Sequence, residues 1–155
     1  MFTVLFVCSG NTCRSPIAEN LLRRKLAGRR TGINVSSAGI YANPGESISP
    51  GARRALQVRG IDAGGFLASA LSEQLVGSAD LILTMTRTHL TALNLSFPAA
   101  NDKTYMLSEF CAQEGDLSDP FGGGAAEYEN CCERIDKLLD IAVEKLVLIV
   151  GDRKS

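Results

Sequence analysis

The chain has little of what a zinc site or a disulfide scaffold requires. It contains one histidine, His89, and five cysteines, an odd number, among 155 residues. Structural zinc needs four Cys or His ligands at short paired spacings, and these residues do not offer that pattern. No export signal is evident at the start of the sequence. We therefore expect reduced thiols and a cytoplasmic location.

Long apolar runs and a strong net charge are also missing. No stretch of 18 apolar residues occurs, which argues against a membrane-spanning helix. The formal net charge is −1 and no basic stripe contains interleaved aromatics, so nucleic acid is not an expected partner. Residues 1–70 carry nine Lys and Arg against three Asp and Glu, whereas residues 71–155 carry seven against fourteen. Solvated helix faces of opposite sign explain this division most simply, and an acidic rim near an active site is the alternative.

The length and the 45% hydrophobic content predict one compact domain over residues 1–155. β-branched and aromatic runs predict strands at 2–8, 33–39, 79–84 and 103–107. Apolar periodicity and start signals predict helices at 15 to about 28–32, 49–60, 71–77, 87–95 and 127 to about 150. Strands that alternate with helices indicate a parallel sheet covered on both faces. We expect a three-layer α/β fold with four parallel strands, of the flavodoxin-like or Rossmann-like type.

The segment between the first strand and the first helix carries the chemistry: Cys8-Ser9-Gly10-Asn11-Thr12-Cys13-Arg14-Ser15. In an open α/β sheet, ligands bind at the carboxyl ends of the strands, where Cys8 lies. The backbone amides of residues 9–15 are expected to converge on an anion at the positive end of the following helix. The same positive field should lower the pKa of Cys8 and so favour the thiolate, which is the nucleophile.

Arg14 suits bidentate binding of two phosphoryl oxygens. Ser15, followed by Pro16, has the form of a helix cap, and its hydroxyl is also placed to donate to the thiolate. A cysteine and an arginine at this spacing arise often by chance, so a buried Cys8 and a surface Arg14 form the alternative interpretation. The preceding strand, the helix start and the intervening Gly10 and Asn11 favour a phosphate-binding loop.

The run from Cys8 to Pro16 resembles the signature of the low-molecular-weight protein tyrosine phosphatases. The similarity extends to Ser37-Ala38-Gly39, to residues 78–85 and to Asp119-Pro120-Phe121-Gly122-Gly123. The resemblance implies that Cys8 attacks phosphorus to form a phosphocysteine and that Asp119 acts first as acid and then as base. By itself, an Asp before a Pro would be read as a turn. The resemblance implies phosphorylated protein substrates and no cofactor or metal, and we expect a monomer.

Two positions differ from the usual pattern of the family and resemble its bacterial protein arginine phosphatases. Thr12 replaces a bulky apolar residue, usually isoleucine, and Phe121 is followed by two glycines where the family has further aromatics. A threonine hydroxyl suits a guanidinium, and Phe121 can stack on its plane. These residues predict a preference for phosphoarginine, with phosphotyrosine as the alternative. Acidic neighbours, Asp116, Glu127 and Glu129, are further candidates for contact with the guanidinium.

A histidine that the family often carries near residue 66 is replaced by Phe66. We expect Asn11 and Ser37 to support the loop instead, and His89 to be a surface residue. The resemblance also implies a reversible disulfide between Cys8 and Cys13, which lie in one tight loop. Simple packing of Cys13 is an equal alternative, and the remaining cysteines are interpreted as packing thiols.

Two other functions are compatible with the loop. Thiol-based arsenate reductases share the fold and loop, but they need a relay of further cysteines after the third strand. Residues 79–110 contain no cysteine, and Cys111 alone is a poor substitute. A noncatalytic phosphate-binding module would lack the nucleophile or the acid, whereas this sequence has both.

Overall fold

The computed structural model describes the backbone of residues 1–154 and the side chains of residues 1–152. The strands are β1 (Phe2–Cys8), β2 (Ile33–Gly39), β3 (Leu81–Thr84) and β4 (Thr104–Met106). The helices are α1 (Arg14–Leu26), α2 (Pro50–Val58), α3 (Glu73–Ser78), α4 (Arg87–Ser96), the 3-10 helix η1 (Pro98–Lys103), α5 (Leu107–Phe110) and α6 (Ala125–Lys154). All four strands were predicted, whereas η1 and α5 were not.

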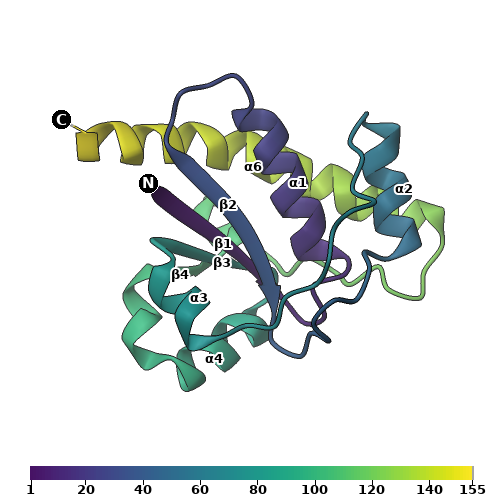
Figure 1. The fold of residues 1–155 in the computed structure, drawn as a ribbon, viewed down its shortest axis with the longest axis horizontal. Helices are drawn as coiled ribbons and strands as arrows, with labels where there is room; N and C mark the ends of the chain where they lie inside the picture. Colours follow the sequence, from purple (N-terminus) through teal and green to yellow (C-terminus); the bar gives the residue numbers. More distant parts are fainter. Residues whose placement is uncertain (155) are drawn as a thin grey trace.

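The four strands form one parallel sheet in the order β2-β1-β3-β4 (Figure 1). This arrangement confirms the predicted three-layer α/β fold. The chain passes from β1 outward to β2 on one side and then continues with β3 on the other side. The order therefore reverses between β1 and β3, and the carboxyl ends of strands at such a reversal are where α/β proteins bind ligands.

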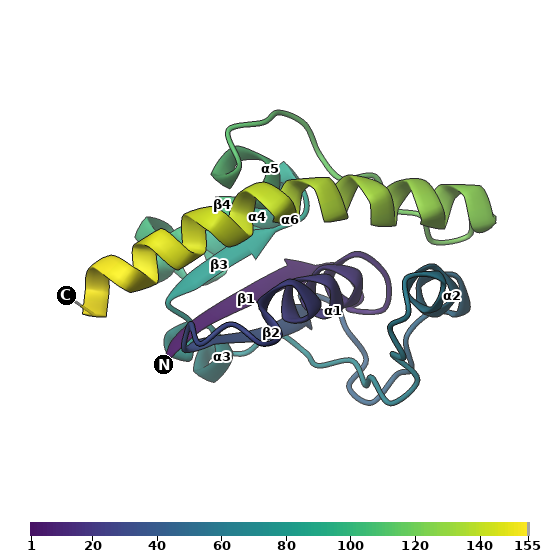
Figure 2. The same cartoon turned by 90° about the horizontal axis from the view of Figure 1, so that it is seen from above.

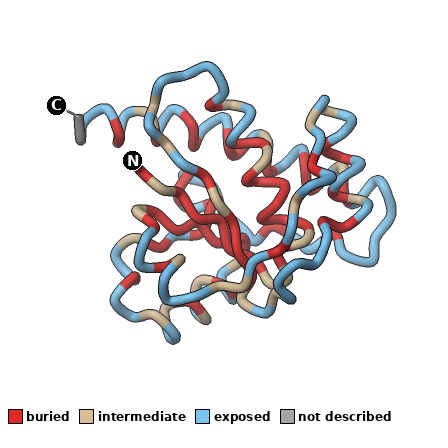
Figure 3. The backbone as a smooth tube through the Cα atoms, viewed as in Figure 1, coloured by how far each residue is buried: buried red, intermediate tan, exposed pale blue. Residues whose placement is uncertain are grey.

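Alternate residues of β1 enter two different apolar layers. Val4 and Phe6 pack with α1, α2, α5 and α6 on one face of the sheet. Leu5 and Val7 pack with residues of α3, α4 and η1 on the other face. Figure 2 shows the long α6 running across the sheet beside α1, and Figure 3 shows the buried backbone concentrated in the central strands. Because β1 is covered on both faces, nearly all of its residues are apolar, which explains the continuous apolar run in this part of the sequence.

Ion pairs join cations of α1 and of the turn after it to acidic residues of α6. Lys25 contacts Asp136 at 2.7 Å and Asp140 at 2.6 Å, and Arg29 contacts Glu144 at 3.2 Å. Each pair joins a cation from the first half of the chain to an anion from the second half. Exposed pairs of this kind contribute about 0–1 kcal/mol each. Part of the charge division therefore lies at the contact between the α1 region and α6.

The start of α1 differs from the prediction. The helix begins at Arg14 with Cys13 at the capping position, and no side chain caps it. Ser15 lies within the helix and its hydroxyl is bonded elsewhere, as described below.

Within the described residues, no helix is both long and apolar enough to cross a membrane.

Candidate active site

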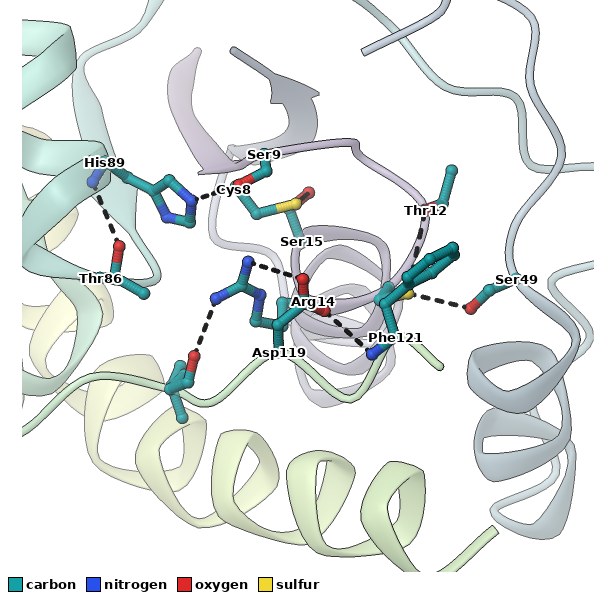
Figure 4. Close-up of polar contacts among 12 residues, drawn as sticks. Cys8, Ser9, Thr12, Arg14, Ser15, Ser49, Thr86, His89, Asp119 and Phe121 are labelled. Atoms are coloured by element: carbon teal, nitrogen blue, oxygen red, sulfur yellow. Dashed lines mark hydrogen bonds and ion pairs between the residues drawn. The ribbon is translucent and has the colours of Figure 1, made fainter. Parts of the chain in front are cut away.

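The loop from Cys8 to Ser15, the phosphate loop, starts at the carboxyl end of β1 and leads directly into α1 (Figure 4). Its one left-handed residue is Asn11, with φ 56°. Asparagine adopts this conformation more readily than most residues. Gly10 does not have a positive φ, so the reversal of the loop depends on Asn11.

The end of β2 holds the first half of the phosphate loop. The amide of Ile40 donates to the Cys8 carbonyl at 3.0 Å, and the amide of Tyr41 donates to the Ser9 carbonyl at 2.9 Å. A Cβ atom at Gly39 would lie 2.6 Å from the Ser9 carbonyl oxygen and 2.8 Å from the Asn11 nitrogen. Only glycine allows the strand to approach the phosphate loop this closely, so Gly39 is required for the packing of β2 against the loop.

A chain of hydrogen bonds leads from Asn11 to the sulfur of Cys8. Asn11 Nδ2 donates to Ser15 Oγ at 2.8 Å and to Ser37 Oγ at 2.9 Å. Ser15 Oγ in turn lies 2.8 Å from Cys8 Sγ. Because Ser15 already accepts a hydrogen bond from Asn11, its hydroxyl hydrogen is available for the sulfur. This arrangement stabilises a thiolate at Cys8 and confirms the expected contact of Ser15 with the nucleophile.

The same network continues to a buried carboxylate. Ser37 donates to Glu19 Oε1 at 3.0 Å, and Asn11 Oδ1 accepts from the Ser69 amide at 2.8 Å. Burial raises the pKa of Glu19, while the charge of Arg23 and the Ser37 hydroxyl favour its ionised form. Asn11 and Ser37 therefore do support the loop, as predicted, and the side-chain amide of Asn11 donates two of its hydrogen bonds and accepts a third within the protein.

The predicted lowering of the Cys8 pKa is wrong for this structure. The thiol is buried, and burial raises its pKa because a low-dielectric surrounding disfavours the thiolate. Hydrogen bonds from the side chain and amide of Ser15, the amide of Asn11 and the charge of Arg14 act in the opposite direction. The anion-binding groups that the sequence indicated are present, but the depth of the sulfur outweighs them.

The expectation that His89 is a surface residue is also wrong. His89 is only 5% exposed, and its Nε2 lies 2.8 Å from Ser9 Oγ (Figure 4). Thr86 caps the start of α4 by accepting from the His89 amide at 3.1 Å, so His89 lies in the first turn of this helix. Burial, followed by the charge of Arg14, lowers the pKa of His89 to about 4. A neutral imidazole thus holds Ser9, and no spacing in the sequence connected residues 9 and 89.

Arg14 and Asp119 lie together over the loop. Arg14 is 5% exposed, and its Nη1 donates to the Leu117 carbonyl at 2.9 Å. Its Nη2 lies 3.5 Å from Asp119 Oδ2. The other carboxylate oxygen of Asp119 accepts from the Phe121 amide at 3.1 Å. Leu117 is fixed in turn by a bond from its amide to the Met85 carbonyl at 3.0 Å, so the end of β3 positions the acid.

A pocket of about 240 Å³ opens above the sulfur. It is lined by Cys8, Gly10, Thr12, Cys13, Arg14, Glu46, Asp119 and Phe121. The structure therefore gathers into one cavity most of the residues that the sequence singled out. Thr12 and Phe121 belong to its wall, and Phe121 is 72% exposed. Glu46, from the loop after β2, was missed, although a residue beyond the carboxyl end of a strand is a natural candidate for this edge.

The three acidic residues proposed from the sequence are engaged elsewhere. Asp116 accepts from the Arg87 amide at 2.8 Å, and Glu127 accepts from the Gly124 amide at 2.8 Å. Glu129 forms two bonds with Arg59, at 2.9 and 2.7 Å. None of the three is among the lining residues of the pocket above Cys8.

Cys13 packs beneath the loop as a free thiol. Its sulfur lies 3.2 Å from Ser49 Oγ and 3.6 Å from the hydroxyl of Tyr128. The amide of Ser49 also donates to the Thr12 carbonyl at 2.9 Å, which ties the start of α2 to the pocket wall. The disulfide with Cys8 stays a prediction that requires the Cys13 sulfur to leave these partners.

The other three cysteines are buried, in agreement with a packing role. Cys111 donates to the Leu138 carbonyl at 3.1 Å. Burial raises the pKa of Cys111 to about 11, that of Cys131 to about 12 and that of Cys132 to about 11. Thiols with such values are poor nucleophiles at neutral pH. These cysteines do not have the properties of the thiol relay that arsenate reduction needs.

The site combines a cysteine and an arginine in one anion-binding loop with an aspartate beside them. These are the features of a cysteine-dependent phosphatase. The family model described as low molecular weight phosphotyrosine protein phosphatase matches residues 3–147. The chain belongs to this family, and it is a phosphoprotein phosphatase.

Two curated relatives carry different substrate names. The protein-arginine-phosphatase of Geobacillus stearothermophilus is 38% identical over 146 residues, which cover 94% of this chain and 96% of that protein. The low molecular weight protein-tyrosine-phosphatase PtpB of Staphylococcus haemolyticus strain JCSC1435 is 37% identical over 132 residues, covering 85% and 91%. The sequence identity of this chain to the two relatives is nearly equal, so it does not decide between phosphoarginine and phosphotyrosine as substrates.

Solved structures agree with the fold. The YwlE arginine phosphatase from Geobacillus stearothermophilus superposes with a TM-score of 0.89 at 38% identity, covering 94% of this chain and 93% of that one. A YwlE variant with a phosphorylated active-site serine in place of cysteine superposes with a TM-score of 0.90 at 36% identity, covering 94% and 95%.

Proposed function

We propose that this protein is a cysteine-dependent protein arginine phosphatase, which hydrolyses phosphoarginine through a phosphocysteine intermediate. The observation that carries the proposal is the pocket in which Cys8, Arg14 and Asp119 meet beside a threonine, Thr12. The relatives named as arginine phosphatases support it, as does the phosphorylated active-site serine of the YwlE variant.

The first step forms the phosphocysteine. The Cys8 sulfur attacks phosphorus while Arg14 and the amides of the phosphate loop bind the phosphoryl oxygens. The bond from phosphorus to the guanidinium nitrogen breaks, and the nitrogen takes a proton from the carboxyl group of Asp119. A positioned acid of this kind contributes about 10²–10⁴ in rate.

The second step restores the enzyme. A water oxygen attacks phosphorus, the bond from sulfur to phosphorus breaks, and inorganic phosphate leaves. Asp119, now a carboxylate, accepts a proton from this water. The Ser15 hydroxyl, 2.8 Å from the sulfur, stabilises the departing thiolate. Both steps use groups already gathered at the pocket, and their atoms balance without a further reactant.

The choice of phosphoarginine follows from the pocket wall. The Thr12 side chain is polar and smaller than that of isoleucine. It therefore suits a planar cation better than it suits an apolar aromatic ring. Phe121 is exposed at the pocket and offers one aromatic face for a guanidinium. Phosphotyrosine is the second candidate, because the similarity to PtpB is of the same order.

We also propose a cytoplasmic location and phosphorylated proteins as substrates. All five cysteines are free thiols, a state that a reducing compartment maintains. Monomeric behaviour stays a prediction, which sedimentation of the purified protein would measure.

The test compares two peptides of identical sequence that carry either phosphoarginine or phosphotyrosine at one position. Release of phosphate is measured side by side with the purified protein. The proposal predicts a kcat/KM for the phosphoarginine peptide at least tenfold above that for the phosphotyrosine peptide. A preference for phosphotyrosine would replace the arginine assignment with the second candidate. Arsenate-dependent thiol consumption would instead point to a reductase.

A further inference from the structure

Glu46 is the second carboxylate of the pocket above Cys8. It lines this pocket together with Asp119, although the two residues come from different segments of the chain. Glu46 follows β2, whereas Asp119 precedes α6. The pocket encloses only about 240 Å³, so a group bound to the phosphoryl site at Cys8 and Arg14 lies close to its whole lining.

The backbone around Glu46 is held in place. The Gly45 amide donates to the Ala68 carbonyl at 2.9 Å, and the Ala68 amide donates to the Glu46 carbonyl at 2.8 Å. The next residue, Ser47, forms an antiparallel bridge with Leu67. Gly45 has φ 86°, a conformation that glycine adopts without strain. The carboxylate therefore extends from a fixed backbone at the rim of the pocket.

The two carboxylates differ in what they already bind. Asp119 contacts Arg14 and the Phe121 amide, and the proposed mechanism uses it as the acid for the leaving group. Glu46 is exposed, and no Lys or Arg side chain among residues 1–152 forms an ion pair with it. Of the two, Glu46 is thus the carboxylate available to a positive charge brought by the substrate.

Phosphoarginine brings such a charge and phosphotyrosine does not. A phosphoryl group bound between Cys8 and Arg14 places the guanidinium of phosphoarginine one bond from phosphorus. The phosphotyrosine ring at the same place is neutral. A rim carboxylate attracts the guanidinium of phosphoarginine, whereas with phosphotyrosine it only repels the phosphoryl charge. Specificity arises from this difference between substrates.

We propose that Glu46 is a specificity-determining residue whose carboxylate pairs with the guanidinium of phosphoarginine, an inference that rests on the proposed function. The expected contribution is about fivefold in kcat/KM, the upper value for an ion pair that stays in contact with solvent. A basic residue beside the phosphorylated position of a substrate protein is the competing source of positive charge, and the experiment separates the two sources.

The experiment measures kcat/KM for Glu46→Gln and for the unchanged protein. Two acetylated peptides without other basic residues carry phosphoarginine or phosphotyrosine at the same position. A third peptide contains phosphotyrosine beside a lysine. Glu133→Gln is the matched control, because it removes the same charge from an exposed residue of α6 that does not line the pocket.

Glu46→Gln is expected to lower the phosphoarginine value about fivefold and to leave the plain phosphotyrosine value unchanged or slightly raised. Glu133→Gln should leave kcat/KM for both peptides unchanged. Equal effects of Glu46→Gln on both peptides, or an effect only with the lysine peptide, would overturn the role of Glu46 while leaving the proposed function intact. A preference of the unchanged protein for phosphotyrosine would reject the proposed function, and this inference with it.

Discussion

The base and the rim of the pocket are built in contrasting ways. At the base, Asn11 and Ser15 are fully buried and joined through Ser37 to Glu19 by hydrogen bonds of 2.8–3.0 Å. At the rim, Glu46 and Phe121 are exposed, and the Asp119 side chain is 49% exposed. The base is thus a satisfied network with one arrangement, whereas the rim consists of side chains from separate loops.

This difference separates chemistry from selectivity. Buried polar groups that lose a partner are costly, so the base constrains the phosphate loop for any phosphoryl substrate. Exposed rim residues can change with little effect on folding, and they contact the part of the substrate beyond phosphorus. Changes at the base, and at the acid Asp119, should therefore impair catalysis, whereas changes at Glu46 and Phe121, and at Thr12 in the pocket wall, should alter the ratio between substrates.

The largest expected effect follows from loss of the nucleophile. Cys8→Ser should reduce hydrolysis of every substrate by more than about 10⁴-fold, because a hydroxyl is far less ionised than a thiol at neutral pH. Phosphate release from both phosphopeptides measures it. Cys111→Ser is the matched control, since a hydroxyl can still donate to the Leu138 carbonyl. Retained activity in Cys8→Ser would contradict the mechanism.

Loss of the acid should come next. Asp119→Asn is expected to lower kcat for phosphoarginine by about 10²–10⁴-fold, because an amide cannot protonate the leaving nitrogen. A substrate with a good leaving group, such as p-nitrophenyl phosphate, should lose less. Asp116→Asn keeps an oxygen for the Arg87 amide and should remain active. An equal loss for good and poor leaving groups would remove the acid role from Asp119.

Asn11→Ala tests the base of the pocket. It removes the donors to Ser15 and Ser37 and the acceptor for the Ser69 amide, so kcat/KM should fall about fivefold to 150-fold, the range that about 1–3 kcal/mol produces. Phosphoarginine and phosphotyrosine peptides should lose activity by the same factor. A change in their ratio would show that the base and the rim are not separable.

The smallest effect concerns His89 and pH. Its pKa is lowered to about 4 in the folded protein from an ordinary 6.5, so the unfolded chain binds more protons between these values. The contribution of His89 to stability is therefore present above pH 6.5 and is lost as pH falls toward 4. Urea unfolding at several pH values should show a shallower dependence in His89→Gln, whose amide can still bond Ser9. Parallel pH profiles would contradict the buried neutral state.

Local patterns predicted the strands and the phosphate loop, because each is encoded within a few consecutive residues, such as the apolar run before Cys8. The acid role of Asp119 came from the family resemblance, since the Asp119-Pro120 pair alone indicates only a turn. What could not be predicted depends on contacts between distant segments. The approach of His89 to Ser9, the entry of Glu46 into the pocket and the burial that raises the Cys8 pKa all require the sheet to bring separate loops together.

Thr12 provides the most direct test of the separation between base and rim. The measurement is the ratio of kcat/KM for phosphoarginine to that for phosphotyrosine in matched peptides, compared between Thr12→Ile and the unchanged protein. The account predicts that the ratio falls about tenfold or more in Thr12→Ile, in the range that a changed pocket contact produces, with activity toward phosphotyrosine maintained. An unchanged ratio would contradict it, because the wall of the pocket would then not select the substrate.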